Sequence, residues 1–351
     1  MAEDNTQLGV IGLGKIGGNL AKQAVEADID VVGMAPSEHE ELQEKGIPIY
    51  DPDEYDKFLS KLSTPRIIYV SVPAGELVDT TLEELAQRAD EGDVVMDGGN
   101  SFWRDSIRRA ERIRDDGLYF LDVGTSGGLP GARNGACFMV GGEEEVFEIA
   151  EPILDELSVE GGLIHAGPSG AGHFVKLVHN GVEFGMLQSI AEGVELLEAG
   201  QFDLDLEEVF RNWNSGSVIR SWLVQLMAEG LEREQSEMVD DPPPFEEIPN
   251  VVEDTGEVNW LVQEAIKGET PVPVISQSVM ELFKSRGNQR HAYRAISLMR
   301  HGFGGHPFGE DDDTLEERVT GRVNNEARSS LAEIDGRSPV RPTDREVDDE
   351  E

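Results

Sequence analysis

The first 140 residues alternate short apolar runs with amphipathic stretches, and this alternation limits the folds open to the chain. Helix-like stretches such as Gly17–Ala27, Glu76–Ala89 and Ser106–Asp116 separate the runs, and Val146–Leu157 follows. Strands that alternate with helices of this length predict βαβ units around a parallel sheet. The runs expected as strands are Gln7–Ile11, Asp30–Met34, Arg66–Val72, Asp93–Asp97, Tyr119–Val123 and Cys137–Val140.

A glycine motif connects the first expected strand to the first expected helix. It reads Gly12-Leu13-Gly14-Lys15-Ile16-Gly17 and fits GxGxxG. In this setting the glycines let backbone approach a pyrophosphate at a helix N-terminus, which predicts a Rossmann-type dinucleotide site. The alternative is a glycine-rich turn that binds nothing.

Two further segments are expected to reach the same cofactor. Val72-Pro73-Ala74 follows the third strand and Asn100 follows the fourth, and ligands of open α/β sheets lie at the carboxyl ends of the strands. The second strand ends in Ala35-Pro36-Ser37, with neither the acid typical of an NAD site nor the Arg typical of an NADP site. Without a cation for a 2′-phosphate, this end favours NAD over NADP.

From about residue 165 the sequence becomes helical throughout. Gly170–Ala199 is a long run with helical period, and shorter helical candidates follow as far as Met299. We therefore expect an α/β Rossmann-type N-terminal domain with an all-α C-terminal domain. The expected limits are 1–164 for the dinucleotide-binding domain, 165–309 for a helical substrate and dimerisation domain, and 310–351 for an acidic tail without stable structure.

The chain carries a formal net charge of −42, which is spread over its whole length and combined with only 29 basic residues. Such a field repels phosphate backbones and anionic lipid, which argues against nucleic-acid and membrane-surface partners. An acid-rich surface of this kind suggests a cytoplasm of high salt, where screening removes most of the self-repulsion. The alternative is an ordinary acidic cytosolic protein.

The single cysteine, Cys137, excludes an internal disulfide and a cysteine-based zinc cluster. The first residues lack the features of a signal peptide, and no apolar run approaches the length of a membrane span. These observations lead us to expect a cytoplasmic protein.

Two segments carry the candidate reaction chemistry. Ser126, Gly127 and Gly128 follow the fifth strand, where a hydroxyl and close backbone amides suit a carboxylate. On the long helix, Lys176, Asn180 and Glu183 stand at i, i+4 and i+7, within about 40° of one face and about 10 Å along the axis. The surrounding apolar residues predict a buried helix, in which desolvation would turn the lysine into a neutral base.

The ordered motifs GLGKIGGN, SVPAG, MDGGNS, DVGTSGG, GHFVKLVHNGVEFGMLQ, DTGEVNW and RHGFGGH resemble 6-phosphogluconate dehydrogenases, in their short form, from about residue 7 to 308. The resemblance implies oxidative decarboxylation of 6-phosphogluconate to ribulose 5-phosphate and CO2 with NAD or NADP and without a metal. It also implies that Lys176 is the base at the C3 hydroxyl, that Glu183 is the acid at C1, and that His179 and Asn180 assist them.

The resemblance implies further contacts with the substrate. Arg300 and His306 match residues that reach the active site of a neighbouring subunit, so a homodimer or homotetramer is expected. The chain departs from the family pattern at Phe184, where many relatives have Tyr, and at Asn259, where Lys or Arg is usual. The positions matched to substrate binding are Asn100, Ser126, Gly127, Gly128, Phe184, Arg286, Arg300 and His306.

Two other functions fit parts of the pattern. A β-hydroxyacid dehydrogenase acting on a smaller acid would share the glycine motif and the helix lysine, but it would need no acid at C1. A catalytically silent paralogue would bind nucleotide or sugar phosphate only, although intact Lys176, Asn180 and Glu183 argue against it.

Overall fold

The structure, a computed structural model, describes residues 6–37, 39–232, 245–287 and 290–304. These residues form two compact units. The first contains the described chain up to residue 185 together with residues 254–276, and the second contains the described residues of 186–253 and those from 277 onward. The domain limits expected at residues 164–165 and 309–310 remain a prediction.

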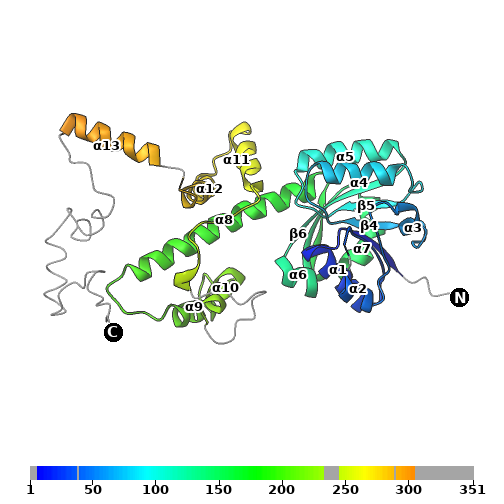
Figure 1. Ribbon diagram of the computed structural model, residues 1–351, viewed down its shortest axis with the longest axis horizontal. Helices are drawn as coiled ribbons and strands as arrows, with labels where there is room; N and C mark the ends of the chain where they lie inside the picture. The colour runs from blue at the N-terminus through cyan, green and yellow to red at the C-terminus, as the bar shows by residue number, and fades with distance from the viewer. Residues whose placement is uncertain (1–5, 38, 233–244, 288–289, 305–351) are drawn as a thin grey trace. The chain divides into compact units, whose positions relative to one another are not determined.

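The first unit (Figure 1) is built on an eight-stranded sheet, in which the strand order is β3-β2-β1-β4-β5-β6-β7-β8. Strands β1 to β6 are parallel, whereas β7 pairs antiparallel with β6, and β8 pairs parallel with β7. The expectation of a parallel sheet is therefore wrong at this edge, because the chain returns from β6 to β7 through a single short helix. The strands are β1 Gln7–Ile11, β2 Asp30–Met34, β3 Ile49–Tyr50, β4 Ile67–Val70, β5 Val94–Asp97, β6 Tyr119–Ser126, β7 Ala136–Gly141 and β8 Ser158–Gly167.

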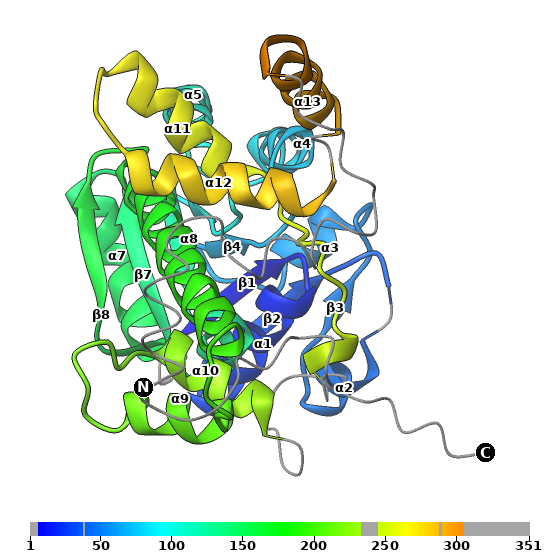
Figure 2. The ribbon, with the colours of Figure 1, turned by 90° about the vertical axis from the view of Figure 1, so that its left-hand side faces the viewer.

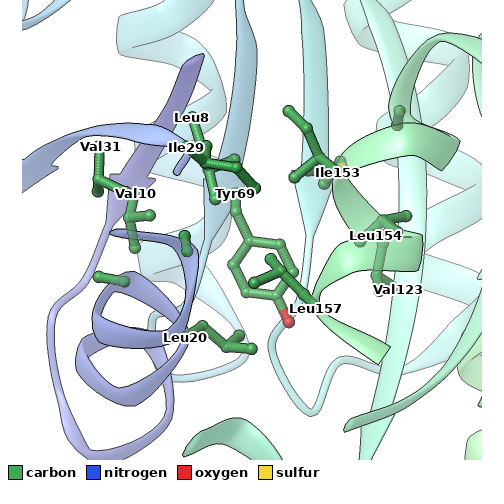
Figure 3. Packing of buried hydrophobic residues seen from close by; sticks show 14 of the residues in the cluster. Leu8, Val10, Leu20, Ile29, Val31, Tyr69, Val123, Ile153, Leu154 and Leu157 are labelled. Carbon is green, nitrogen blue, oxygen red and sulfur yellow. The ribbon is translucent and has the colours of Figure 1, made fainter. Parts of the chain in front are cut away.

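Helices cover both faces of this sheet. One apolar core joins the sheet to α1, α6 and α7, and a second joins it to α3, α4 and α5. Figure 3 shows the first core around Tyr69 of β4, which is 2% exposed and lies among Leu8, Val10, Leu20 and Leu157. The helices of this part are α1 Lys15–Glu26, α2 Glu40–Glu44, α3 Tyr55–Leu59, α4 Glu76–Ala86, α5 Trp103–Asp115, α6 Gly128–Asn134 and α7 Glu144–Glu156.

The described elements beyond β8 are all helical, as the sequence predicts. Helix α8 (Ala171–Glu198) leaves the sheet, and α11 with the start of α12 lies alongside its first half (Figure 2). In the second unit, the end of α8 packs with α9 and α10 around Phe210, which is fully buried. The remaining helices are α9 Leu206–Asn214, α10 Trp222–Leu231, the 3-10 turn η1 Phe245–Glu247, α11 Glu257–Lys267, α12 Pro273–Ser285 and α13 Arg290–Gly304.

Candidate active site

The glycine motif between β1 and α1 has the shape that a pyrophosphate requires. Gly12 has a φ of +93°, and a Cβ there would lie 2.3 Å from the Ser71 carbonyl oxygen. A Cβ on Gly17 would lie 2.0 Å from the Gly12 carbonyl oxygen, whereas a Cβ on Gly14 would meet nothing within 4 Å. Gly14 caps α1 without a side-chain hydrogen bond, and no acid occupies the first turn. The helix N-terminus is therefore open to an anionic group, which fits a dinucleotide.

The end of β2 offers little charge to the adenosine half of a cofactor. Ala35 is buried beside the sheet, and Pro36 and Ser37 are exposed. The Ser37 hydroxyl lies 3.3 Å from His39 Nε2, and His39 is a polar neighbour that the sequence pattern did not single out. Among the described residues of this turn, neither a carboxylate nor an arginine takes the place that usually selects NAD or NADP.

A buried network shapes the two loops at the carboxyl ends of β4 and β5. Asp97, which is fully buried, accepts hydrogen bonds from the Gly99 amide at 3.1 Å and from the Ser101 hydroxyl at 2.8 Å. Arg109 of α5 is 1% exposed and donates to Asp97 at 3.3 Å and to the Gly75 carbonyl at 2.9 Å. One guanidinium thus ties the loop that carries Asn100 to the loop that carries Val72, Pro73 and Ala74.

Close contact between α8 and the sheet brings the lysine to the same edge. A Cβ on Gly172 would lie 2.4 Å from the Asp122 carbonyl oxygen, and a Cβ on Gly124 would lie 2.5 Å from Lys176 Cβ. The buried Asp122 carboxylate accepts from the amides of Gly170 at 2.6 Å and His173 at 2.8 Å, at the start of α8. The glycines allow the helix to approach and the carboxylate fixes its first turn, so that Lys176 lies against β6.

Lys176 meets Asn100 at this edge. Its Nζ donates to Asn100 Oδ1 at 2.7 Å, a contact that joins α8 to the loop after β5. Burial lowers the pKa of Lys176, while the charges of Glu257 and Glu183 act in the opposite direction. A lysine with a lowered pKa supplies more of the neutral amine at a given pH, which is what a general base requires.

His179 and Asn180 link the turn after β6 to α11. The Ser126 hydroxyl lies 3.1 Å from His179 Nε2, and His179 Nδ1 lies 3.1 Å from Asn180 Oδ1. Asn180 Nδ2 donates to Glu257 Oε1 at 3.1 Å. No local spacing in the sequence points to Glu257, because its partner Asn180 lies 77 residues earlier in the chain.

The expectation that α8 is a buried helix is wrong for one side of its first half. Leu177 is 5% exposed, but Phe174, Val175, Val178 and Val182 are 36–50% exposed. Lys176, Glu183 and Phe184 are half-buried. Gly172 lies against the sheet and Gly181 lies against Leu261 of α11 and Ile275 of α12, whereas the exposed apolar residues form a separate stripe.

Some expected site residues belong to the second compact unit or lie outside the described residues. Arg286 and Arg300 belong to the second compact unit, where Arg286 Nε donates to the Val252 carbonyl at 3.1 Å and Arg300 is exposed on α13. His306 lies outside the described residues. Gly127, with a φ of +116°, and Gly128 follow Ser126 directly at the start of α6.

The described residues show neither a metal-binding cluster nor a membrane-spanning helix. No group of three or more His, Cys, Asp or Glu side chains there could hold a metal ion. No described helix combines the length and apolar character needed to cross a membrane.

Comparison with known proteins identifies the family. Residues 7–166 match the NAD binding domain of 6-phosphogluconate dehydrogenase, and residues 172–320 match the 6-phosphogluconate dehydrogenase C-terminal domain. The NAD(+)-dependent, decarboxylating 6-phosphogluconate dehydrogenase of Haloferax volcanii is 40% identical over 88% of this chain and 100% of that protein. The NADP(+)-dependent, decarboxylating enzyme of Bacillus subtilis is 35% identical over 80% of this chain and 61% of that protein.

A solved structure supports the fold. The 6-phosphogluconate dehydrogenase of Plasmodium falciparum, at 24% identity, superposes with a TM-score of 0.72 over 89% of this chain and 68% of that chain. Both halves of the sequence thus match one family, and the relatives include enzymes of both cofactor specificities. The chain belongs to the 6-phosphogluconate dehydrogenase family, in its short form.

Proposed function

We propose that this chain catalyses oxidative decarboxylation of 6-phosphogluconate to ribulose 5-phosphate and CO2, with Lys176 as the base and Glu183 as the acid. The hydrogen bond between Lys176 Nζ and Asn100 Oδ1, at 2.7 Å, carries the assignment of the base. In its neutral form, the amine donates one proton to Asn100 and keeps its lone pair for the C3 hydroxyl.

The chain's residues would move protons in two stages. When bound, the nicotinamide supplies the acceptor for the hydride that leaves C3. Lys176 takes the C3 hydroxyl proton as the carbonyl forms, and the protonated lysine then donates back to that oxygen while the C1–C2 bond breaks. CO2 departs, and the electron pair of the broken C1–C2 bond forms the C2=C3 double bond of the enediol.

Glu183 completes the reaction in this proposal. It helps to protonate the former C2, which is C1 of ribulose 5-phosphate, while the enediol hydroxyl on the former C3 returns its proton to Lys176 and the ketone forms there. Lys176 and Glu183 lie two turns apart on α8, and the charge of Glu183 acts on Lys176. A base and an acid spaced along one helix suit a substrate that reacts first at C3 and then at the neighbouring carbons. Asn100, Ser126, Gly127, Gly128, His179 and Asn180 are proposed to hold the substrate.

An assay with three readouts tests the proposal. The purified chain is mixed with 6-phosphogluconate and either NAD or NADP, and cofactor reduction, CO2 and ribulose 5-phosphate are measured. We expect all three in equal amounts. Reduction without CO2 would instead indicate a β-hydroxyacid dehydrogenase, and no reduction with either cofactor would indicate a silent binding protein.

For the cofactor, we propose a preference for NAD. Ala35, Pro36 and Ser37 offer no cation to a 2′-phosphate, and the net charge of −42 opposes an additional unpaired dianion. The ratio of kcat/KM for NAD to that for NADP tests this preference, and a ratio below one would contradict it.

We further propose that the working enzyme is a homodimer or homotetramer. The exposed apolar stripe of Phe174, Val175, Val178 and Val182 is a feature that association would cover. Arg300 and His306 are proposed to reach the substrate of a neighbouring subunit. Light scattering on the eluting protein measures the assembly, and a monomer at assay concentration would contradict this part.

The proposed setting is a cytoplasm of high salt. The acidic excess is spread along the chain, and screening shortens the range of its self-repulsion to a few ångströms in molar salt. Activity measured against KCl concentration tests this setting. We expect activity to rise toward molar KCl, and an optimum at low salt would contradict the proposal.

A further inference from the structure

A chain of hydrogen bonds runs from the turn after β6 to the start of α11. It connects Ser126 Oγ to His179 Nε2, His179 Nδ1 to Asn180 Oδ1, and Asn180 Nδ2 to Glu257 Oε1, each at 3.1 Å. At its far end, the Thr255 hydroxyl donates to Glu257 Oε2. All of these residues belong to the same compact unit.

The Glu257 carboxylate, at the α11 end of this hydrogen-bond series, determines the direction of every hydrogen bond in the series. An ionised carboxylate can only accept hydrogen bonds, so Asn180 must turn its amide nitrogen toward Glu257. The Asn180 oxygen then faces His179 Nδ1 and needs a donor there. His179 Nδ1 must therefore carry a proton.

The same reasoning extends to Ser126. In a neutral imidazole only one nitrogen carries a proton, so Nε2 is an acceptor when Nδ1 is the donor. The Ser126 hydroxyl must then donate to His179 Nε2. We propose that Glu257, acting through Asn180, holds neutral His179 in the Nδ1–H tautomer and commits the Ser126 hydroxyl proton to His179 in the ligand-free enzyme.

Burial makes this orientation firm. Asn180 is 5% exposed and Glu257 is 9% exposed, so water cannot readily replace either partner. A reversed Asn180 amide would place its oxygen against the carboxylate, so that two buried acceptors would face each other without a proton between them, which costs far more than an exposed mismatch. Glu257 is thus a positioning residue, which acts on His179 and Ser126 without touching either.

This inference deepens the proposed function and rests on it only for the statement that Ser126 and His179 hold substrate. The direction of the protons can be measured without substrate or cofactor. Failure of the CO2 assay with the tautomer intact would remove the substrate role but leave the proton arrangement standing. A working CO2 assay with His179 in the other tautomer would contradict the proposed proton arrangement but leave the proposed reaction standing.

The experiment is two-bond nitrogen–proton NMR on the full chain with ¹⁵N-labelled histidine, at about pH 8.5, where an ordinary imidazole is neutral. The His179→Gln variant assigns the signals of His179 among those of the seven histidines. We expect one set of His179 cross-peaks with the pattern of the Nδ1–H form. A predominant Nε2–H pattern for His179 in the unaltered protein would overturn the proposal.

A matched pair of substitutions tests the role of the carboxylate. Glu257→Gln offers Asn180 both a donor and an acceptor, so we expect the single His179 pattern to be lost to a mixture of both tautomers. Glu264→Gln changes the same residue type on the same helix, where Glu264 binds Arg104 and Lys267 instead, and should leave the pattern unchanged. An unchanged pattern in a folded Glu257→Gln protein would overturn the assignment to Glu257.

Discussion

Arg109 is the side chain whose removal should damage the candidate site most while touching no ligand. Its guanidinium is 1% exposed and meets Asp79 at 3.0 Å, Asp97 at 3.3 Å and the Gly75 carbonyl at 2.9 Å. Arg109→Met keeps an unbranched apolar side chain but leaves the fully buried Asp97 without its cation. We expect a loss of both stability and activity.

The size of the effect follows from burial. Removing one partner of a buried ion pair costs about 3–5 kcal/mol, because the other charge remains in a medium of low dielectric constant. Arg108 is the matched control: it meets the same Asp79 at 3.0 Å, but its side chain is 50% exposed. Loss of such an exposed pair costs about 0–1 kcal/mol, since solvent replaces and screens it.

Urea unfolding of Arg109→Met, Arg108→Met and the unaltered protein, at one KCl concentration, measures the difference. We expect the Arg109 variant to lose at least about 2 kcal/mol more than the Arg108 variant, and to lose kcat at a temperature where it remains folded. Equal losses in the two variants would refute the reasoning, because they would show that burial of the Asp97 pair contributes nothing.

Three further predictions concern the base and the cofactor loop. Burial lowers the pKa of Lys176 and the charge of Glu257 opposes this, so Glu257→Gln should lower the pKa of Lys176 further. The acid limb of the pH profile of kcat/KM should then move to lower pH, and a shift to higher pH would contradict this. Gly14→Ala should fold normally, because its Cβ meets nothing within 4 Å, but should raise KM for the cofactor several-fold; an unchanged KM would place the pyrophosphate elsewhere. Gly17→Ala should instead lower the unfolding midpoint, because its Cβ would lie 2.0 Å from the Gly12 carbonyl oxygen; a midpoint like that of the unaltered protein would contradict the close approach.

The sequence predicts the continuous, apolar part of the fold well. The observed bounds of β1 and β2 coincide with the predicted runs Gln7–Ile11 and Asp30–Met34, because these strands are buried on both faces. Strand β8 is missing from the prediction because three of its ten residues are glycines and most of the strand is not buried. Helix α6, GLPGARN, carries the composition of a turn. The antiparallel pairing of β6 with β7 follows from the short connection through α6, so it could not be foreseen.

The site was predictable only where its residues share one element. The spacing of Lys176, Asn180 and Glu183 on α8 is visible in the sequence as helical periodicity. The contact of Lys176 with Asn100 spans 76 residues, and that of Asn180 with Glu257 spans 77. Contacts over such distances depend on tertiary packing, here on the glycines that bring α8 to β6, and no local pattern encodes them.

The central claim is that Lys176 is the base, and the Lys176→Met variant tests it most directly. Binding of 6-phosphogluconate is measured by calorimetry, and CO2 and reduced cofactor are measured in the same preparation. Loss of a general base costs about 10²–10⁴-fold in rate, so we expect turnover to fall by at least about a hundredfold while substrate binding remains measurable. A Lys176→Met protein that releases CO2 within about tenfold of the normal rate would contradict the account.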